Sequence, residues 1–200
     1  MNNNESIKVK LTFTEEVLGT ANSNPDIHRE FIASKAPDAA STEEEVESLG
    51  VDAVVEKSMT IFPKDENGIP FLYDYQIKGM FKDSAGMLKR VPGSKSSKIK
   101  AYKKEIDGLI FVEPRKIPFT LSGPIGDCQR PLRASTLQGE RVALADSETV
   151  PAGSSITFNI ILLNKDLEPA VREWLDYGAL RGIGQWRNSG KGRFTWEEVD

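Results

Sequence analysis

Apolar and polar side chains alternate along residues 7–13, and this alternation is the clearest strand pattern in the chain. A period of two is typical of a β-strand that buries one face. The apolar members of the segment lie two residues apart, at Ile7, Val9, Leu11 and Phe13. A chain that opens this way is expected to build a sheet with one face in the core.

Later segments carry strand signals of other kinds. An apolar run at 155–163 follows the turn sequence Val150-Pro151-Ala152-Gly153 and predicts a well-buried strand. Shorter strands are expected at 109–112 and 117–121. A final strand is expected at 194–199, after a glycine-rich segment.

Two segments have the spacing of amphipathic helices. Residues 75–88 repeat apolar side chains every three or four positions, at Ile77, Met80, Phe81, Ala85 and Leu88. A second helix is expected at 167–180 with Asp166 as its N-cap, and shorter helical pieces at 25–35 and 42–48. This order of elements favours an α+β fold, an antiparallel sheet with helices on one face and loop or hairpin insertions.

The connections between these elements also carry signals. Asn67-Gly68 lies between two extended runs and predicts a β-hairpin around 57–72. Residues 129–142 are expected to pair into a further hairpin. Residues 91–104 combine Pro-Gly and several serines with five lysines, which is the composition of a mobile basic loop.

Composition places the chain among globular proteins. Of 200 residues, 38% are hydrophobic and 28% are charged, so one core can form and wholesale disorder is not expected. A single cysteine excludes an intramolecular disulfide and a multi-cysteine zinc site. The N-terminus lacks a signal-peptide pattern, and no apolar run reaches the roughly 18 to 20 residues that cross a bilayer. We expect a soluble, cytoplasmic protein without membrane contact.

The formal net charge of −4 conceals a strong segregation of charge. Residues 1–58 carry 5 basic and 12 acidic side chains, a net of −7, whereas residues 86–141 carry 12 basic and 5 acidic side chains, a net of +7. Salt screens charges beyond about 8 to 10 Å, so a basic face of this size can hold phosphates on an acidic protein. The alternative is two oppositely charged, solvated insertions that touch each other.

The sharpest local feature is the glycine-rich segment 180–194. Its glycines allow positive φ and the close approach of a phosphate or another backbone, and its other side chains offer charge and a stacking ring: Gly182, Gly184, Gly190, Gly192, Arg187, Lys191, Arg193, Trp186. The segment lacks the Gly-Lys-Ser/Thr ending of a Walker A loop, and it follows a helix, which a Rossmann turn does not. It suits single-stranded nucleic acid. The alternative is a structural helix C-cap and hairpin with solvated basic residues.

Four segments, taken in order, resemble motifs of one known family. They are the first strand ending in Val17-Leu18-Gly19, the segment from Asp65 to Lys82, the strand led by Pro151-Ala152-Gly153, and the glycine-rich loop. Together they resemble the RAMP superfamily, the ferredoxin-like, RNA-handling proteins of CRISPR effector complexes. The family commonly has Pro-Gly-Ser-Ser before a Leu-Lys-Gly helix, whereas this chain has Tyr73-Asp74-Tyr75-Gln76 there, which leaves the role of that turn open.

The resemblance implies one RAMP-like domain over residues 1–200, with a ferredoxin-like, RRM-type core. It also implies an acidic insertion near 20–56 and a basic, thumb-like insertion near 89–116 that reaches the next copy. In backbone subunits of effector complexes, such cores stack along guide RNA and contact its phosphates. The contacts that carry over are Lys78, Lys82 and, in the glycine-rich loop, Gly182, Gly184, Trp186, Arg187, Gly190, Lys191, Gly192 and Arg193. Lys95 and Lys98 of the basic insertion are further candidate contacts to nucleic acid.

Catalysis has weaker support in the sequence. Some RAMP nucleases use a histidine, and others an aspartate after the first strand, so Asp26 and His28 are candidates by position, although neither lies in a matching motif. Asp38 and the acidic run 43–47 lack a fixed ligand spacing and are read as a solvated face. Cys128 has no paired base. We therefore expect no metal and no cofactor.

Three hypotheses follow from these observations. The first is a non-catalytic RAMP-type module that binds single-stranded RNA or DNA, RNA being favoured, and assembles with itself or within a larger ribonucleoprotein complex. The second is a phage or mobile-element protein that engages a CRISPR or other host complex without binding nucleic acid, which the negative net charge favours. The third is a RAMP-type endoribonuclease, which would lose its activity on substitution of Asp26 or His28.

Overall fold

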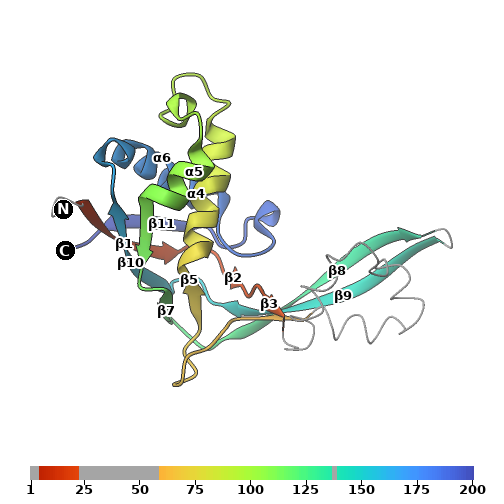
Figure 1. The fold of residues 1–200 in the computed structure, drawn as a ribbon. Helices are drawn as coiled ribbons and strands as arrows, with labels where there is room; N and C mark the ends of the chain where they lie inside the picture. Colours follow the sequence, from red (N-terminus) through yellow and green to blue (C-terminus); the bar gives the residue numbers. More distant parts are fainter. Residues whose placement is uncertain (1–4, 23–58, 137–138) are drawn as a thin grey trace, which may run out of the picture. The chain divides into compact units, whose positions relative to one another are not determined.

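The computed structural model describes residues 5–22, 59–136 and 139–200 (Figure 1). The chain divides into two compact units. The first unit consists of Met1–Val17, Pro63–Pro124 and Val150–Asp200, and the second of Leu18–Phe62 and Ile125–Thr149. The helical pieces expected at 25–35 and 42–48 lie outside the described residues.

The first unit is built on an antiparallel sheet. Its strands follow the order β11-β1-β10-β7-β5, and β6 also pairs with β10. The bounds are Glu5–Phe13 for β1, Phe71–Tyr73 for β5, Ile110–Glu113 for β6, Lys116–Thr120 for β7, Ser155–Leu162 for β10 and Phe194–Glu198 for β11. Because β6 and β7 lie along the same side of β10, they act as one interrupted strand.

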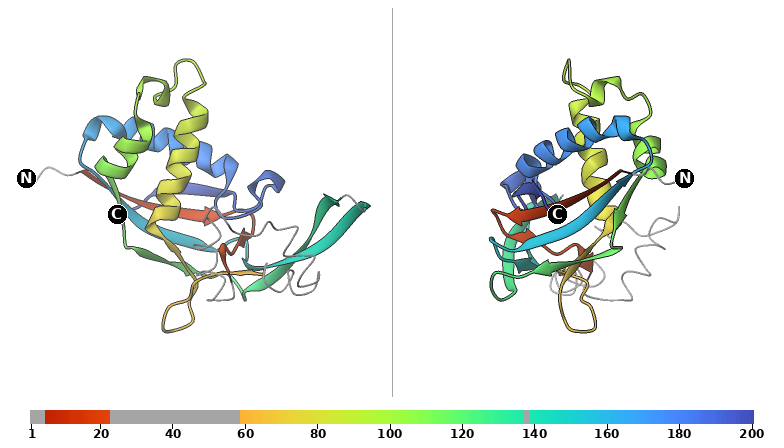
Figure 2. Two further views of the ribbon diagram at one scale, coloured as in Figure 1. Left: turned by 45° about the vertical axis from the view of Figure 1, so that its right-hand side comes forward. Right: turned by 90° about the vertical axis from the view of Figure 1, so that its left-hand side faces the viewer.

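Two helices connect these strands in the manner of a ferredoxin-like fold. Helix α4 (Asp74–Leu88) lies between β1 and β6, and helix α6 (Glu168–Arg181) lies between β10 and β11. Each of these pairs of strands runs parallel, with one antiparallel strand between them. Both helices pack on one face of the sheet (Figure 2). The predicted α+β class, with helices on one face of an antiparallel sheet, is confirmed.

The core of the first unit lies between that sheet face and the helices. The alternating residues predicted for β1 are all buried, as are Ile77, Met80, Phe81 and Ala85 of α4 and Val171, Trp174 and Leu175 of α6. The prediction fails at the ends of the two helices, where Leu88 is only half-buried and Leu180 is 72% exposed. The rings of Phe81 and Trp174 meet between the helices, with centroids 5.8 Å apart. The opposite sheet face carries mostly polar side chains on its two central strands, among them Lys8, Lys10, Thr157 and Asn159.

The turn predicted at Asn67-Gly68 is present, but the extended runs on either side of it pair with each other only next to the turn, because Phe71–Tyr73 pairs with β7 and residues 60–61 pair within the second sheet. Lys64 and Pro70 form an antiparallel bridge, and the backbone N–H of Gly68 donates to the carbonyl of Asp65 at 3.0 Å. One carboxylate oxygen of Asp65 also accepts the N–H groups of Asn67 and Ile69. Gly68 has φ +78°, the left-handed conformation that this turn requires.

The second unit is built on a smaller sheet of order β2-β9-β4-β3, with β8 beside β9. The bounds are Val17–Leu18 for β2, Ala21–Asn22 for β3, Thr60–Ile61 for β4, Gly126–Thr136 for β8 and Gly139–Val150 for β9. Strands β8 and β9 pair over their whole length, so the predicted hairpin is confirmed and is longer than the sequence indicated. Among the described residues, no helix has the length and apolar composition to span a membrane.

Candidate nucleic-acid interface

The two predicted lysines of α4 both face helix α5 (Tyr102–Leu109). Lys82 forms an ion pair with Asp107, with Nζ 2.6 Å from Oδ1. Lys78 donates to the backbone carbonyl of Asp107 at 3.1 Å, and its Nζ lies 5.3 Å from the centroid of the Phe111 ring. The structure therefore brings Lys78 and Lys82 together, but at contacts that already join α4 to α5 and β6.

The glycines of the loop between α6 and β11 serve a close contact between backbones. The N–H of Ile183 donates to the carbonyl of Gly192 at 3.0 Å, and the N–H of Gly192 donates to the carbonyl of Glu16 at 2.8 Å. A Cβ on Gly192 would lie 1.9 Å from the carbonyl oxygen of Ile183, and a Cβ on Gly182 would lie 2.4 Å from that of Lys191. Of the two possibilities that the glycines left open, the approach of another backbone is the one observed at Gly182 and Gly192.

The basic residues of this loop differ in their surroundings. Arg187 donates to Asp83 of α4, with Nη1 2.7 Å from Oδ2, and Lys191 pairs with Glu16. Arg193 immediately precedes β11, and its exposed side chain lies next to Gly190. Two of the three predicted phosphate contacts in the loop thus sit beside carboxylates of the same protein, which lowers the local positive potential.

Trp186 lies at the corner of the loop, immediately before the 3-10 turn η3 (Arg187–Ser189). Its φ of +55° is left-handed, and it is the single such non-glycine residue in the part of the chain that the structure describes. Its side chain is 40% exposed. The hydroxyl of Ser189 donates to the carbonyl of Trp186 at 2.9 Å, which holds this corner in place.

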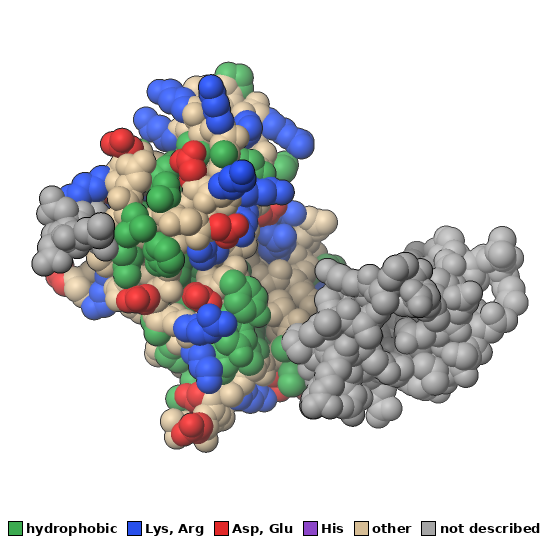
Figure 3. Space-filling view, viewed as in Figure 1, with side chains coloured by type: hydrophobic (Ala, Val, Ile, Leu, Met, Phe, Trp, Pro, Cys, Tyr) green, Lys and Arg blue, Asp and Glu red, His purple; other side chains and the backbone are tan. Residues whose placement is uncertain are grey.

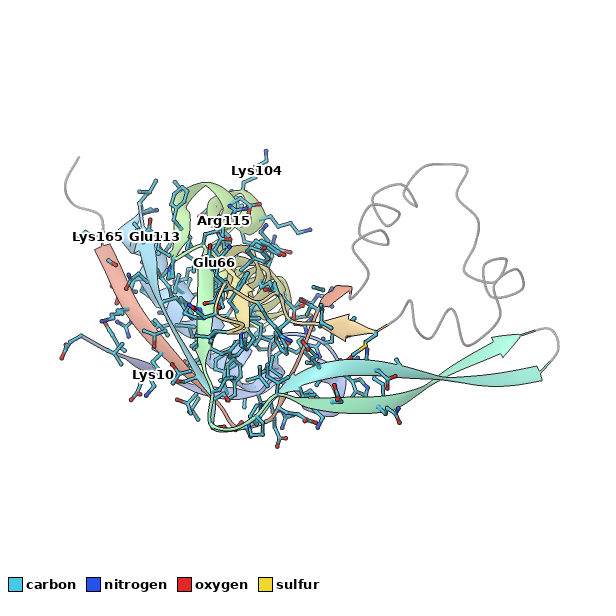
Figure 4. The ribbon with its side chains drawn as sticks, turned by 90° about the horizontal axis from the view of Figure 1, so that it is seen from below. Lys10, Glu66, Lys104, Glu113, Arg115 and Lys165 are labelled. Atoms are coloured by element: carbon cyan, nitrogen blue, oxygen red, sulfur yellow. The ribbon has the colours of Figure 1, made fainter. Side chains whose placement is uncertain are left out.

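A cationic surface lies on the segment between α4 and α5 and on the first turn of α5. Residues 89–104 contain seven lysines and arginines and no acidic residue, and all seven side chains are exposed: Lys89, Arg90, Lys95, Lys98, Lys100, Lys103, Lys104. We call this set the apical basic cluster. In Figure 3, blue side chains gather at the top of the view, where Figure 1 places the connection from α4 to α5. Figure 4 shows Lys104 pointing away from the fold. The predicted residues Lys95 and Lys98 belong to it.

The expected loop is shorter than the sequence indicated, because residues 102–104 belong to α5 and only residues 91–101 form turns. It contains the 3-10 turn η1 (Ser96–Lys98) and runs directly into α5, and Ser96 and Ile106 are fully buried. The carboxylate of Glu173 accepts the backbone N–H groups of Lys95 at 2.9 Å and Ser96 at 3.2 Å. Residues 110–113 of the expected thumb-like insertion form β6 within the main sheet.

Buried hydrogen bonds explain why a serine-rich and lysine-rich segment is ordered. The indole N–H of Trp174 donates to the hydroxyl of Ser96 at 2.8 Å, and that hydroxyl donates to Glu173 at 3.0 Å. The hydroxyl of Ser94 donates to the carbonyl of Leu88 at 2.7 Å. The role of Glu173 could not be predicted from the sequence. Its place in an amphipathic helix indicates only a polar position, and its partner Ser96 is 77 residues away.

The predicted site residues therefore lie in three places. Lys78 and Lys82 lie between α4 and α5, the glycine-rich loop lies on the Asp83 side of α4, and Lys95 and Lys98 lie in the apical basic cluster. Asp26 and His28 lie outside the described residues. Within the described ranges, no three His, Cys, Asp or Glu side chains are grouped so that they could hold a metal ion.

Two side chains of the first unit have shifted pKa values. Burial, followed by the neighbouring Tyr73 and Asp74, raises the pKa of Tyr75, while Arg115 lowers it by a smaller amount. Hydrogen bonds to Glu198 and Glu168 raise the pKa of Arg172. The second shift reflects a structural tie between α6 and β11.

Comparisons with known proteins give a likeness of fold. No protein-family model and no curated protein sequence matches the chain. A similar solved structure is a chain in the cryo-EM structure of the Type III-B Cmr-beta bound to cognate target RNA, with a TM-score of 0.57 and 12% sequence identity. The likeness covers 98% of this chain and 61% of that chain. This protein thus has the fold of part of a Type III-B Cmr-beta chain, which agrees with the ferredoxin-like core expected from the RAMP resemblance.

Proposed function

We propose that this protein is a non-catalytic, RAMP-type module that binds single-stranded nucleic acid, RNA in preference to DNA, without reading its sequence. The observation that carries the proposal is the apical basic cluster, in which seven exposed cations and no acidic residue lie within residues 89–104. The similarity in fold to a chain from an RNA-bound complex supports RNA as the ligand. Polymeric phosphate suits such a surface, because it presents many negative charges to several cations at once.

The first phosphate contacts are assigned to the apical basic cluster, with Lys95 and Lys98 at its centre. Each phosphate neutralised by a lysine or arginine releases condensed counterions, so the cluster gains most at low salt. Hydrogen bonds that join this segment to Glu173 and Trp174 fix the backbone that carries the cations before binding. A fixed backbone reduces the entropy lost on association. Arg193 and Trp186 of the glycine-rich loop extend the contact, with Trp186 offering a face for a base.

The paired basic residues contribute less. Lys82, Arg187 and Lys191 would have to share or exchange Asp107, Asp83 and Glu16 in order to bind a phosphate. Such an exchange replaces one ion pair with another and gives little net free energy. These residues hold α4, α5 and the glycine-rich loop together.

The test compares two double variants by fluorescence anisotropy with labelled single-stranded RNA and DNA of about 30 nucleotides at several salt concentrations. Replacement of Lys95 and Lys98 by alanine should weaken binding and reduce the slope of log K against log salt by about 1.4, because each contact to a single strand contributes about 0.7. The matched control replaces Lys8 and Lys10, which lie on the opposite sheet face, and should keep the wild-type slope.

Two outcomes would contradict this proposal. Absence of binding by the wild-type protein at low salt would remove nucleic acid as the ligand. An equal loss in the Lys8 and Lys10 control would move the contact to the sheet face or reduce it to net charge. A third double variant, Arg187→Ala with Lys191→Ala, tests the glycine-rich loop by itself, and unchanged affinity would end its assignment as a phosphate site.

We also propose that copies associate along the bound strand, because residues 1–58 carry a net charge of −7 and residues 86–141 a net charge of +7. Opposite charges on two parts of one chain favour head-to-tail contacts between copies. Light scattering with and without RNA measures the association. A complex that stays at one protein per strand on long RNA would contradict it.

The second candidate is a protein-interaction module that engages a CRISPR or other host complex without nucleic acid. The observation in its favour is an exposed apolar group at the ends of β6 and β10, where Phe111 is 43% and Leu163 is 49% exposed. Phe111 lies opposite Ile161 in the strand register, so these side chains are neighbours. Under this hypothesis the wild-type protein captures a host complex without retaining nucleic acid, and Phe111→Ser weakens that capture in a co-purification experiment.

A further inference from the structure

Three aromatic side chains are arranged in series where β5 joins α4. Tyr73 and Tyr75 are stacked, with ring centroids 5.2 Å apart and an angle of 17° between the ring planes. Phe71 meets Tyr73 edge to face, with centroids 5.1 Å apart and an angle of 88°. This set of three residues, the aromatic ladder, occupies the turn in which the chain departs from the serine-rich pattern of RAMP proteins.

Exposure increases along the aromatic ladder. Phe71 is 3% exposed, Tyr73 is half-buried and Tyr75 is 59% exposed. One ring face of Tyr75 lies against Tyr73, so most of its exposed area belongs to the outer face and the edge. The helix does not require a tyrosine there, because the first turn of α4 is closed by the side chain of Gln76, which accepts the N–H of Tyr73 at 2.8 Å.

Two cations accompany the ladder. Lys116 lies opposite Tyr73 in the pairing of β5 with β7, and its Nζ is 5.3 Å from the centroid of Phe71. Arg115, which Figure 4 labels, lies beside the start of α4, because its backbone carbonyl accepts the N–H of Asp74 at 3.0 Å. The acidic neighbour is Asp74, whose Oδ1 accepts the backbone N–H of Tyr75 at 2.8 Å.

We propose that the outer face of Tyr75 is a stacking platform for one unpaired nucleobase of the bound strand, with Arg115 and Lys116 facing the phosphates beside it. The proposal rests on the proposed function and adds a site that neither the glycine-rich loop nor the apical basic cluster contains. A nucleotide within a strand is the occupant that fits, because its base is flat and stacks on a ring in the geometry that Tyr73 and Tyr75 already show, while its backbone phosphate can meet the adjacent cations.

The position differs from base stacking on the middle of an RRM-type sheet. On the sheet face away from the helices, the two central strands carry Lys8, Lys10 and Thr12 in β1 and Thr157 and Asn159 in β10. No aromatic side chain of β1 or β10 lies on this face in the described residues. The aromatic ladder therefore moves the stacking surface to the edge strand β5 and the start of α4.

The experiment separates bases from phosphates. Affinity is measured for an oligouridylate of about 12 nucleotides, within the usual site size for one small domain, and for a chain of equal length built from stable abasic ribose units. The proteins are the wild type, Tyr75→Ala and Tyr75→Phe. Removal of the ring removes its stacking interaction with the base. Tyr75→Ala should therefore bind oligouridylate about 5- to 150-fold more weakly. Tyr75→Phe should retain the wild-type affinity.

The possible results either support or overturn the stacking platform at Tyr75. The proposal is supported when Tyr75→Ala loses affinity for oligouridylate alone and Tyr75→Phe restores it, with ultraviolet cross-linking of the oligouridylate mapped to Tyr73 or Tyr75. Unchanged affinity of Tyr75→Ala, or an equal loss on both chains, overturns the stacking platform and leaves the proposed function intact. Failure of the wild-type protein to bind either chain at low salt overturns both.

Discussion

At the scale of single residues, the glycine-rich loop illustrates how one composition serves two purposes. Gly182 and Gly192 are required by backbones in contact, whereas Gly190 has open space that Arg193 borders. The positive φ values of 83°, 89° and 70° at Gly182, Gly190 and Gly192 are permitted by the missing side chain. The sequence predicted this freedom correctly, but the identity of the approaching group depends on how the loop folds back on its own Ile183 and on Glu16, which no local pattern connects to the loop.

Replacement of Gly192 by alanine should destabilise the fold. The new Cβ would lie 1.9 Å from the carbonyl oxygen of Ile183, at a φ of +70°, so the backbone must move. We expect the free energy of unfolding to fall by at least about 2 kcal/mol in urea denaturation. The control is Gly79→Ala in α4, where a Cβ meets nothing within 4 Å and should raise the free energy of unfolding by about 0.5 to 1 kcal/mol. Equal stability of the two variants would contradict the close backbone contact.

Tyr75 should ionise only at strongly alkaline pH. Its pKa is raised above the ordinary value of 10.0, chiefly by burial, so the folded state holds this proton more tightly than the unfolded state. The contribution to stability is therefore complete below pH 10 and is lost as the pH rises through the folded-state value. Ultraviolet difference spectroscopy of the wild type against Tyr75→Phe measures the titration. A phenolate that forms below pH 10 would contradict the packing of Tyr75 on Tyr73.

At the scale of elements, the segment between α4 and α5 shows the limit of composition. Lysine, serine and Pro-Gly predicted a loop, yet Ser94 and Ser96 are buried and bonded. Composition describes how a segment behaves in water by itself. Here Trp174 and Glu173 of α6 supply partners, and satisfied buried hydrogen bonds outweigh the weak local propensity.

Ser96→Ala should therefore cost more than its size suggests. The indole N–H of Trp174, a fully buried side chain, would lose its acceptor, and Glu173 would lose one of its donors. We expect the free energy of unfolding to fall by about 1 to 3 kcal/mol in urea denaturation. Ser97→Ala is the matched control: its hydroxyl donates to the carbonyl of Ser94 at 2.6 Å, but Ser97 is exposed, so water can replace this bond and stability should change by less than about 0.5 kcal/mol. Similar losses in both variants would contradict the buried network.

At the scale of the whole molecule, the distribution of charge matters more than its sum. The chain carries a net charge of −4, yet residues 89–104 carry seven cations and no acidic residue. Ionic strength screens the distant acidic side chains beyond about 8 Å in physiological salt, while the cations act together at a bound phosphate.

Binding to single-stranded RNA should follow that local charge. We expect the slope of log K against log salt to lie between about −2 and −5, the steeper bound being seven contacts at about 0.7 each. Filter binding or anisotropy over a series of potassium chloride concentrations measures the slope. A slope near zero would show that the apical basic cluster does not meet phosphates, whatever the affinity.

The sequence by itself determined β1, α4, β6, β7, β10, α6 and β11 in their order, the turn at Asn67-Gly68 and the segregation of charge, because periodicity, turn chemistry and charge are properties of neighbouring residues. Helix α5 was not predicted, because its first residues have the composition of the loop before it. Only the tertiary structure decided which cations are already paired. Lys191 meets Glu16 across 175 positions and Arg187 meets Asp83 across 104 positions. Such pairs depend on the order of the strands in the sheet. That order depends on the packing of side chains from the whole chain, and no short segment of the sequence contains this information.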